Sequence, residues 1–192
     1  KLIRTAFHTN NVDHCTRLCH ASSVAALLEC VSSGAVSAPF TAVSDSDCAI
    51  VIGARPTTNH PVAATYFKQA AKKGTKLIII DPRTNEMTKN AYEHLAFKPG
   101  TDVALLNSLI YTIIEEELYD KEYIQKHTLG FEQLKNHLEK FSPNKMDKTT
   151  GISASTIYQV ARLFSTTKKG IIFWGMGISQ HIHGTYNARC LI

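Results

Sequence analysis

The chain has 192 residues, and its 21 lysines and arginines outnumber its 16 acidic residues, which gives a formal charge of +5 with the nine histidines neutral. A hydrophobic share of 44% and a charged share of 19% are typical of a globular domain and exclude a disordered or collagen-like chain. The apolar runs, such as 77–80 and 171–174, are far shorter than the roughly 18 residues that a membrane-spanning helix needs. We therefore expect no membrane insertion.

The cysteines and the charges exclude further classes of protein. The five cysteines are odd in number and unevenly spaced, so they do not form the framework of a secreted disulfide-rich protein. No charged-then-apolar signal segment opens the chain, and we expect a reducing, cytoplasmic location. The positive charge is spread out and lacks interleaved aromatic residues, so we expect no nucleic-acid partner. An anionic small ligand is compatible with this charge.

The two ends of the sequence are abrupt. The first residue is Lys1 rather than methionine, and the last segment, 185–192, stops within an apolar helical pattern that has no capping residue. We therefore expect the chain to be an internal fragment of a longer subunit.

Strands and helices alternate from residue 48 onwards. The apolar run 48–53 predicts a strand buried on both faces, the segment 60–73 predicts a helix with Pro61 in its first turn, and 76–80 predicts a second strand after Gly74. Two strands joined through a helix form a βαβ unit, whose crossover is right-handed.

The remaining elements follow the same scheme. The sequence pattern predicts a loop with a helix within 85–92, a short strand at 94–98, and a helix from Asp102 as N-cap to about residue 118. It then predicts helices at 120–127 and 130–141 and a polar loop at 142–151. A helix at 153–164, with Ser153 as N-cap, and a strand at 170–174 complete the prediction. The loop 142–151 is the nearest candidate for a linker. We expect a three-layer αβα fold with a mostly parallel, dinucleotide-binding-like sheet over 48–192, preceded by a leading segment over 1–47. Together these form one domain of a larger subunit.

Ligands of open α/β sheets bind at the carboxyl ends of the strands. The segment after the first predicted strand has no G-x-G-x-x-G, which argues against a nicotinamide fingerprint. Asp81 and Arg83 follow the second strand and can either bind a nucleoside and a phosphate or simply cap a turn and face water. Asp102, after Gly100, has the same two interpretations, and the glycines of 175–177 either let backbone approach a ligand or form an ordinary turn.

A concentration of soft ligands precedes the sheet. Three imidazoles and two thiols lie within 8–20, namely His8, His14, Cys15, Cys19 and His20. A structural zinc site needs a second ligand pair, which Cys30 and Cys48 do not supply and His181 with His183 supplies poorly. An iron–sulfur loop needs cysteine where Ser22 stands. A single thiolate ligand to a cofactor-borne metal, or simply buried thiols and surface histidines, are the remaining interpretations.

The segment 9–20, TNNVDHCTRLCH, resembles the active-site segment of molybdenum or tungsten formate dehydrogenase catalytic (alpha) subunits of the cytoplasmic type, in the molybdopterin oxidoreductase superfamily. The resemblance continues in order along the chain at 23–25, 34–37, 59–61, 81–83, 99–107, 151–155, 174–177 and Gln180.

This resemblance implies roles for individual residues. Cys19 would be the metal ligand, in the cysteine version of the site, and His20 would handle the proton of the substrate or position formate. The cofactor-binding positions implied by the resemblance are Gly53, Arg55, Asn59, His60, Asp81, Arg83, Gly100, Thr101, Asp102, Gly175, Met176, Gly177 and Gln180. Arg55 stands where the family usually has asparagine, and a guanidinium there can reach a pyrophosphate.

The resemblance also implies the chemistry of the parent subunit. Formate would be oxidised to CO2 with transfer of two electrons through a molybdenum or tungsten centre held by two molybdopterin guanine dinucleotides (bis-MGD). A 4Fe-4S cluster would lie in the missing N-terminal part, and electron-transfer subunits or the remaining domains would be the partners. The 192 residues alone are expected to be inactive. Two alternatives are a different-substrate member, such as a nitrate reductase, and a non-catalytic scaffold like the large subunit of respiratory NADH dehydrogenases.

Overall fold

The computed structural model describes residues 1–192 and contains one four-stranded sheet. The strands are β1 (Cys48–Ile52), β2 (Lys76–Ile80), β3 (Glu93–Leu95) and β4 (Gly170–Trp174), in the order β3-β2-β1-β4. Every neighbouring pair is parallel, and Ile50 of β1 lies opposite Ile78 of β2 and Ile172 of β4. The predicted α/β class with a parallel sheet is confirmed.

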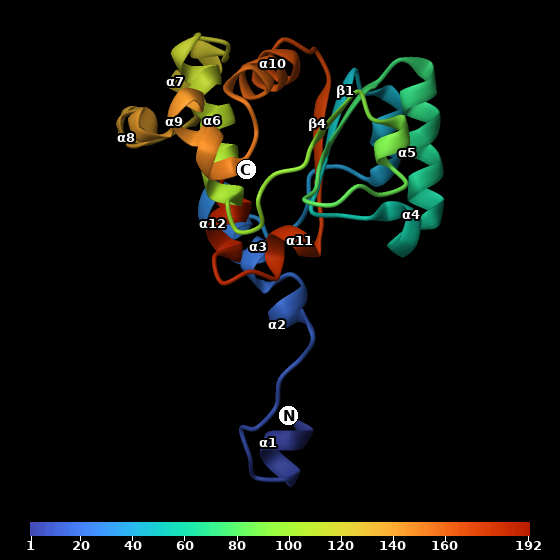
Figure 1. The fold of residues 1–192 in the computed structure, drawn as a ribbon. Helices are drawn as coiled ribbons and strands as arrows, with labels where there is room; N and C mark the ends of the chain where they lie inside the picture. The colour runs from blue at the N-terminus through green and yellow to red at the C-terminus, as the bar shows by residue number, and fades with distance from the viewer.

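Helices cover both faces of the sheet, with α5 (Pro61–Lys73) on one side and α6 (Asp102–Glu115) and α10 (Ala154–Ser165) on the other (Figure 1). Alternate side chains of β1 enter two separate cores: Ile50 and Ile52 pack in the core beneath α6 and α10, and Val51 packs beneath α5. Such burial on both faces explains why the strands are continuous apolar runs rather than alternating patterns.

The other helices are short. They are α1 (Leu2–Ala6), α2 (Thr16–Cys19), α3 (Ala21–Val31), α4 (Pro56–Asn59), α7 (Lys121–His127), α8 (Phe131–Leu138), α9 (Pro143–Thr150), α11 (Met176–Ser179) and α12 (Gly184–Arg189), with 3-10 turns η1 (Phe40–Asp45), η2 (Thr88–Asn90) and η3 (Glu139–Phe141). The longest helix, α6, has 14 residues. No helix has the combined length and hydropathy needed to cross a bilayer.

Capping residues set several helix ends as the sequence predicts. The helix α10 starts after Ser153, whose hydroxyl accepts a hydrogen bond from the Thr156 amide at 3.2 Å. Gly74 ends α5 with φ of +113°, a left-handed conformation that glycine adopts without strain. These local signals made these two helix boundaries predictable.

The segment 142–151, predicted to be a polar loop and a candidate linker, is the helix α9. Pro143 occupies the first turn, and Gly151 ends the helix with φ of +77°. Pro143 and Thr150 are buried, and the Lys98 amide donates to the Thr150 carbonyl at 2.8 Å. The prediction was wrong because this helix owes its stability to packing against α6 and α10, which its polar composition does not reveal.

Three further predictions change in detail. Thr101, not Asp102, is the N-cap of α6, and Asp102 is the first residue of that helix, which ends at Glu115 rather than near residue 118. The segment 85–92 contains only the 3-10 turn η2. The third strand, predicted at 94–98, is β3 at Glu93–Leu95.

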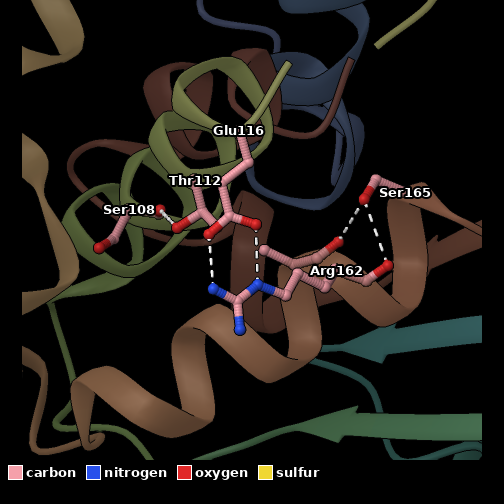
Figure 2. Close-up of polar contacts among 6 residues, drawn as sticks. Ser108, Thr112, Glu116, Arg162 and Ser165 are labelled. Atoms are coloured by element: carbon pink, nitrogen blue, oxygen red, sulfur yellow. Dashed lines mark hydrogen bonds and ion pairs between the residues drawn. The ribbon is translucent and has the colours of Figure 1, made fainter. Parts of the chain in front are cut away.

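Polar contacts join the two long helices on the α6 face of the sheet (Figure 2). Arg162 of α10 donates two hydrogen bonds of 2.7 Å to the carboxylate of Glu116, which caps the end of α6. The Glu116 side chain is 28% exposed and that of Arg162 is 57% exposed, so water screens this bidentate pair. Its contribution to the stability of the helix pair is therefore small.

The leading segment runs from an extended arm into the body of the molecule. The helix α1 lies away from the sheet, whereas α3 packs against α12 at the other end of the sequence (Figure 1). Arg189 of α12 donates to Glu29 of α3 at 2.7 Å. Residues 21–31 and 184–189 therefore form one packed unit.

Candidate cofactor site

A cavity of about 620 Å³ opens at the carboxyl ends of β1, β2 and β4, where the strand-end loops meet. It brings together most of the positions that the resemblance implied for the cofactor: Gly53, Arg55, Asn59, His60, Asp81, Arg83, Gly100, Asp102, Gly175, Met176 and Gly177. Residues that are far apart in the sequence meet here because parallel strands end at one edge of the sheet. Thr101 and Gln180 do not line the cavity.

Two of the strand-end loops touch backbone to backbone. The Gly177 amide donates to the Gly53 carbonyl at 2.9 Å, and a Cβ on Gly177 would lie 2.6 Å from the Gly53 Cα. Gly53 has φ of +57°, and a Cβ on Gly175 would lie 2.8 Å from Ala54 Cβ. These glycines are needed for the contact between the loops, a reason that the sequence alone did not supply.

Two carboxylates line the cavity. Asp81 is 7% exposed and accepts a hydrogen bond from the Arg83 amide at 2.8 Å, which is the turn-capping arrangement. Asp102 is 4% exposed, and burial raises the pKa of its carboxyl group, while its own backbone amide and nearby His181 act in the opposite direction. A buried carboxylate in a cavity favours a ligand that supplies hydrogen-bond donors.

Two guanidinium groups lie among the other lining residues. Arg55 and Arg83 are exposed and form none of the ion pairs within residues 1–192. A guanidinium offers a planar fork of donors that matches phosphate oxygens. Free arginines beside buried carboxylates therefore fit a ligand that carries both an anion and a donor-bearing base.

Aromatic side chains complete the lining, and the predicted site residues did not include them. Phe40, from the turn η1, and Trp174, the last residue of β4, both line the cavity. Trp174 ends a strand, so its position was a usable signal. Phe40 comes from the leading segment, and only the folded chain shows that this turn packs on α5 beside the cavity.

Cys19 and His20 lie outside the cavity lining. Cys19 is the last residue of α2 and is half-buried, and His20 is exposed at the start of α3. Contacts between α2 and α11, the helix that follows β4, hold this segment near the strand-end loops. Nowhere in residues 1–192 do three His, Cys, Asp or Glu side chains gather as a metal site would require.

A second cavity of about 690 Å³ lies between α6, α10 and the last residues of the chain. Of its 18 lining residues, 15 are hydrophobic, which does not fit a ligand that carries phosphates. The cavity at the strand ends, which has four charged lining residues, is the better candidate for a site that holds such a ligand.

The sequence profile of the molybdopterin oxidoreductase family matches residues 1–192. The chain belongs to the molybdopterin oxidoreductase family. Formate dehydrogenase H of Escherichia coli (strain K12) is 39% identical over 191 residues, which cover 100% of this chain and 27% of that protein. The F420-dependent formate dehydrogenase subunit alpha of Methanocaldococcus jannaschii is 37% identical over 191 residues, which cover 100% of this chain and 28% of that protein.

Proteins that are not named formate dehydrogenases are also similar to this chain. A nitrate reductase of Synechocystis is 32% identical over 194 residues, covering 100% of this chain and 27% of that protein. The solved structure of acetylene hydratase from Pelobacter acetylenicus superimposes with a TM-score of 0.81 at 30% identity, over 92% of this chain and 24% of that one. Family membership therefore establishes a relation to molybdopterin proteins and leaves the substrate open. The chain spans about 27–28% of the length of the first two relatives.

Proposed function

We propose that the complete protein is the catalytic subunit of a formate dehydrogenase, which oxidises formate to CO2, a proton and two electrons. The observation that carries this proposal is the adjacent pair Cys19–His20, whose helices α2 and α3 contact α11, together with a nearby cavity that combines free arginines with buried carboxylates. Sequence identity of 37–39% to proteins named formate dehydrogenase supports formate as the substrate.

The proposed cofactor is bis-MGD with molybdenum or tungsten, and when bound it supplies the metal that accepts the two electrons. Arg55 and Arg83 would hold its phosphates. Asp81 and Asp102 would accept hydrogen bonds from the N1 and N2 donors of a guanine, which would offset the cost of burying their charge. The other binding positions proposed are Gly53, Asn59, His60, Gly100, Thr101, Gly175, Met176, Gly177 and Gln180.

Cys19 and His20 would provide the reactive side chains of this chain. A thiolate is a soft, anionic ligand that suits molybdenum or tungsten, and coordination keeps it deprotonated. The exposed imidazole of His20 can accept a proton and can also hold formate by a hydrogen bond. Residues 1–47 would thus carry the reactive segment, and residues 48–192 the dinucleotide-binding part of the same domain.

The rest of the machinery would come from outside these residues. We propose that a 4Fe-4S cluster and an electron-transfer partner, whether a subunit or another domain, take the electrons away. The protein would act in the cytoplasm. The 192-residue chain by itself is expected not to turn over formate.

Replacing Cys19 in the complete protein tests the proposal. Cys19→Ser should lower metal content and reduce formate oxidation by at least about a hundredfold, since an alkoxide is a poor substitute for a soft ligand. Cys15→Ser, which changes a nearby exposed thiol, is the matched control and should retain both properties. Wild-type turnover in Cys19→Ser would contradict the assignment.

The nitrate reductase relatives make nitrate reduction the second candidate. A substrate panel with formate and nitrate on the wild-type complete protein separates the two, because each reaction is followed by its own dye assay. A protein that contains no metal and acts on neither substrate would instead match a scaffold of the NADH dehydrogenase type.

A further inference from the structure

Two buried serines and the half-buried Trp174 connect the segment after His20 with the end of β4. The indole Nε1 of Trp174 donates to Ser23 Oγ at 3.0 Å, and Ser23 Oγ lies 2.8 Å from Ser179 Oγ. Ser22 Oγ donates to the Ser179 carbonyl at 2.9 Å. The contacts join α3 to β4 and α11, which lie more than a hundred residues apart in sequence. We call Ser23, Trp174 and Ser179 the serine–tryptophan link.

The two serines of the serine–tryptophan link are buried, and the backbone around Ser179 is closely packed. Ser23 is 7% exposed and Ser179 is 6% exposed, so water cannot replace a lost partner at low cost. A Cβ on Gly184 would lie 2.3 Å from the Ser179 carbonyl oxygen, which shows how closely α12 packs on this peptide. Asn187 Nδ2 also donates to the neighbouring Ile178 carbonyl at 3.2 Å. The end of α11 is therefore fixed from several sides.

The link lies between the two parts of the proposed site. Trp174 and the loop 175–177 line the cofactor cavity, so the indole has one side on the cavity and its N–H on Ser23. Ser23 is in the first turn of α3, three residues after His20, and α2 with Cys19 contacts α11. A shift of α3 against β4 would move Cys19 and His20 relative to the cavity.

We propose that Ser23, Trp174 and Ser179 are positioning residues that hold Cys19 and His20 in place relative to the cofactor cavity. This proposal rests on the proposed function for its catalytic consequence, but not for its structural one. Neither serine lines the cavity, so both act through the segment they hold.

The structural consequence is measured in the cofactor-free complete protein, by alkylation with iodoacetamide and peptide mass spectrometry. Cys19 is half-buried and Cys15 is exposed, so Cys15 is an internal reference. Ser23→Ala should raise the alkylation rate of Cys19, relative to that of Cys15, about fivefold. The loss of one hydrogen bond of typical net strength changes an equilibrium by about this factor. Ser179→Ala and Trp174→Phe should change the ratio in the same direction. Ser165→Ala removes a hydroxyl that bonds within α10 and should leave it unchanged (Figure 2).

An unchanged ratio in all three link variants would overturn the proposal, and so would an equal change in Ser165→Ala. Three variants are used because one of them alone can fail to fold. The double variant Ser23→Ala/Ser179→Ala should react no faster than Ser23→Ala alone, because Ser23→Ala already removes the hydrogen bond that Ser179→Ala would remove.

The catalytic consequence is measured in the metal-loaded protein. Ser23→Ala should lower kcat for formate by about tenfold or more with KM within about twofold and metal content unchanged, since misplaced reactive groups slow the chemical step. An unchanged kcat would contradict the positioning role. If the wild-type protein does not oxidise formate while the Cys19 ratio still responds to Ser23→Ala, the proposed function fails and the structural link stands.

Discussion

Asp102 shows how burial changes the pKa of a single carboxyl group in the proposed site. Its carboxyl group is 4% exposed, and burial raises its pKa above the ordinary 3.8 despite the opposing effects of its backbone amide and His181. A raised pKa in the folded state means that the ionised form costs stability. This cost is fully present above the folded-state pKa and disappears as the pH falls below 3.8.

Asp102→Asn should therefore increase the stability of the cofactor-free protein at pH 7, by no more than a few degrees in Tm. The advantage over the wild type should shrink as the pH falls towards 4, because the wild-type carboxyl group then also becomes neutral. Thermal unfolding followed by circular dichroism between pH 4 and 7 measures this difference. A variant that is less stable than the wild type at pH 7, or a difference that does not depend on pH, would contradict the buried-charge account.

Sequence reasoning at the residue scale succeeded where strand ends identified positions. Asp81 and Arg83 directly follow β2, and both line the cavity. Their roles in binding remain predictions. Sequence reasoning missed Phe40, because a residue in the leading segment reaches the cavity only through tertiary packing. For Gly177 it gave an incomplete reason, because only the fold shows that Gly177 lies against Gly53.

At the scale of elements, the close packing of α12 on α11 requires glycine at position 184. Because a Cβ there would lie 2.3 Å from a backbone oxygen, Gly184→Ala should reduce the free energy of unfolding by about 1–3 kcal/mol, the usual cost of overpacking. Urea unfolding measures the change. Gly34→Ala is the control, since its nearest neighbour is a side-chain methyl at 3.3 Å that can move. Equal losses in the two variants would show that backbone proximity at Gly184 is unimportant.

Caps and hydrophobic periodicity predicted the elements that carry strong local signals. Ser153 precedes the start of α10 and Gly74 ends α5 as expected, and β2 was predicted with its observed bounds. The helix α9 was missed because a polar stretch that starts with proline and ends with glycine satisfies both a loop and a short helix. Only its contacts with α6 and α10 decide between them.

At the scale of the whole molecule, the alternation of strands and helices was sufficient to predict a parallel three-layer fold. The strand order β3-β2-β1-β4 and the packing of α3 on α12 were not predictable, because both depend on which distant segments meet. That packing brings the start and the end of the chain together. It also places the segment with Cys19 and His20 beside the strand-end loops, through contacts of α2 and α3 with α11.

The metal and pterin content of the complete protein, purified without oxygen, tests the central claim most directly. Metal analysis and the fluorescence of released pterin give the amounts, and acid hydrolysis identifies the attached nucleotide. We expect molybdenum or tungsten together with pterin that releases a guanine nucleotide, in amounts that fall in Cys19→Ser. A folded protein that contains neither metal nor pterin, or whose pterin carries no guanine nucleotide, would contradict the account.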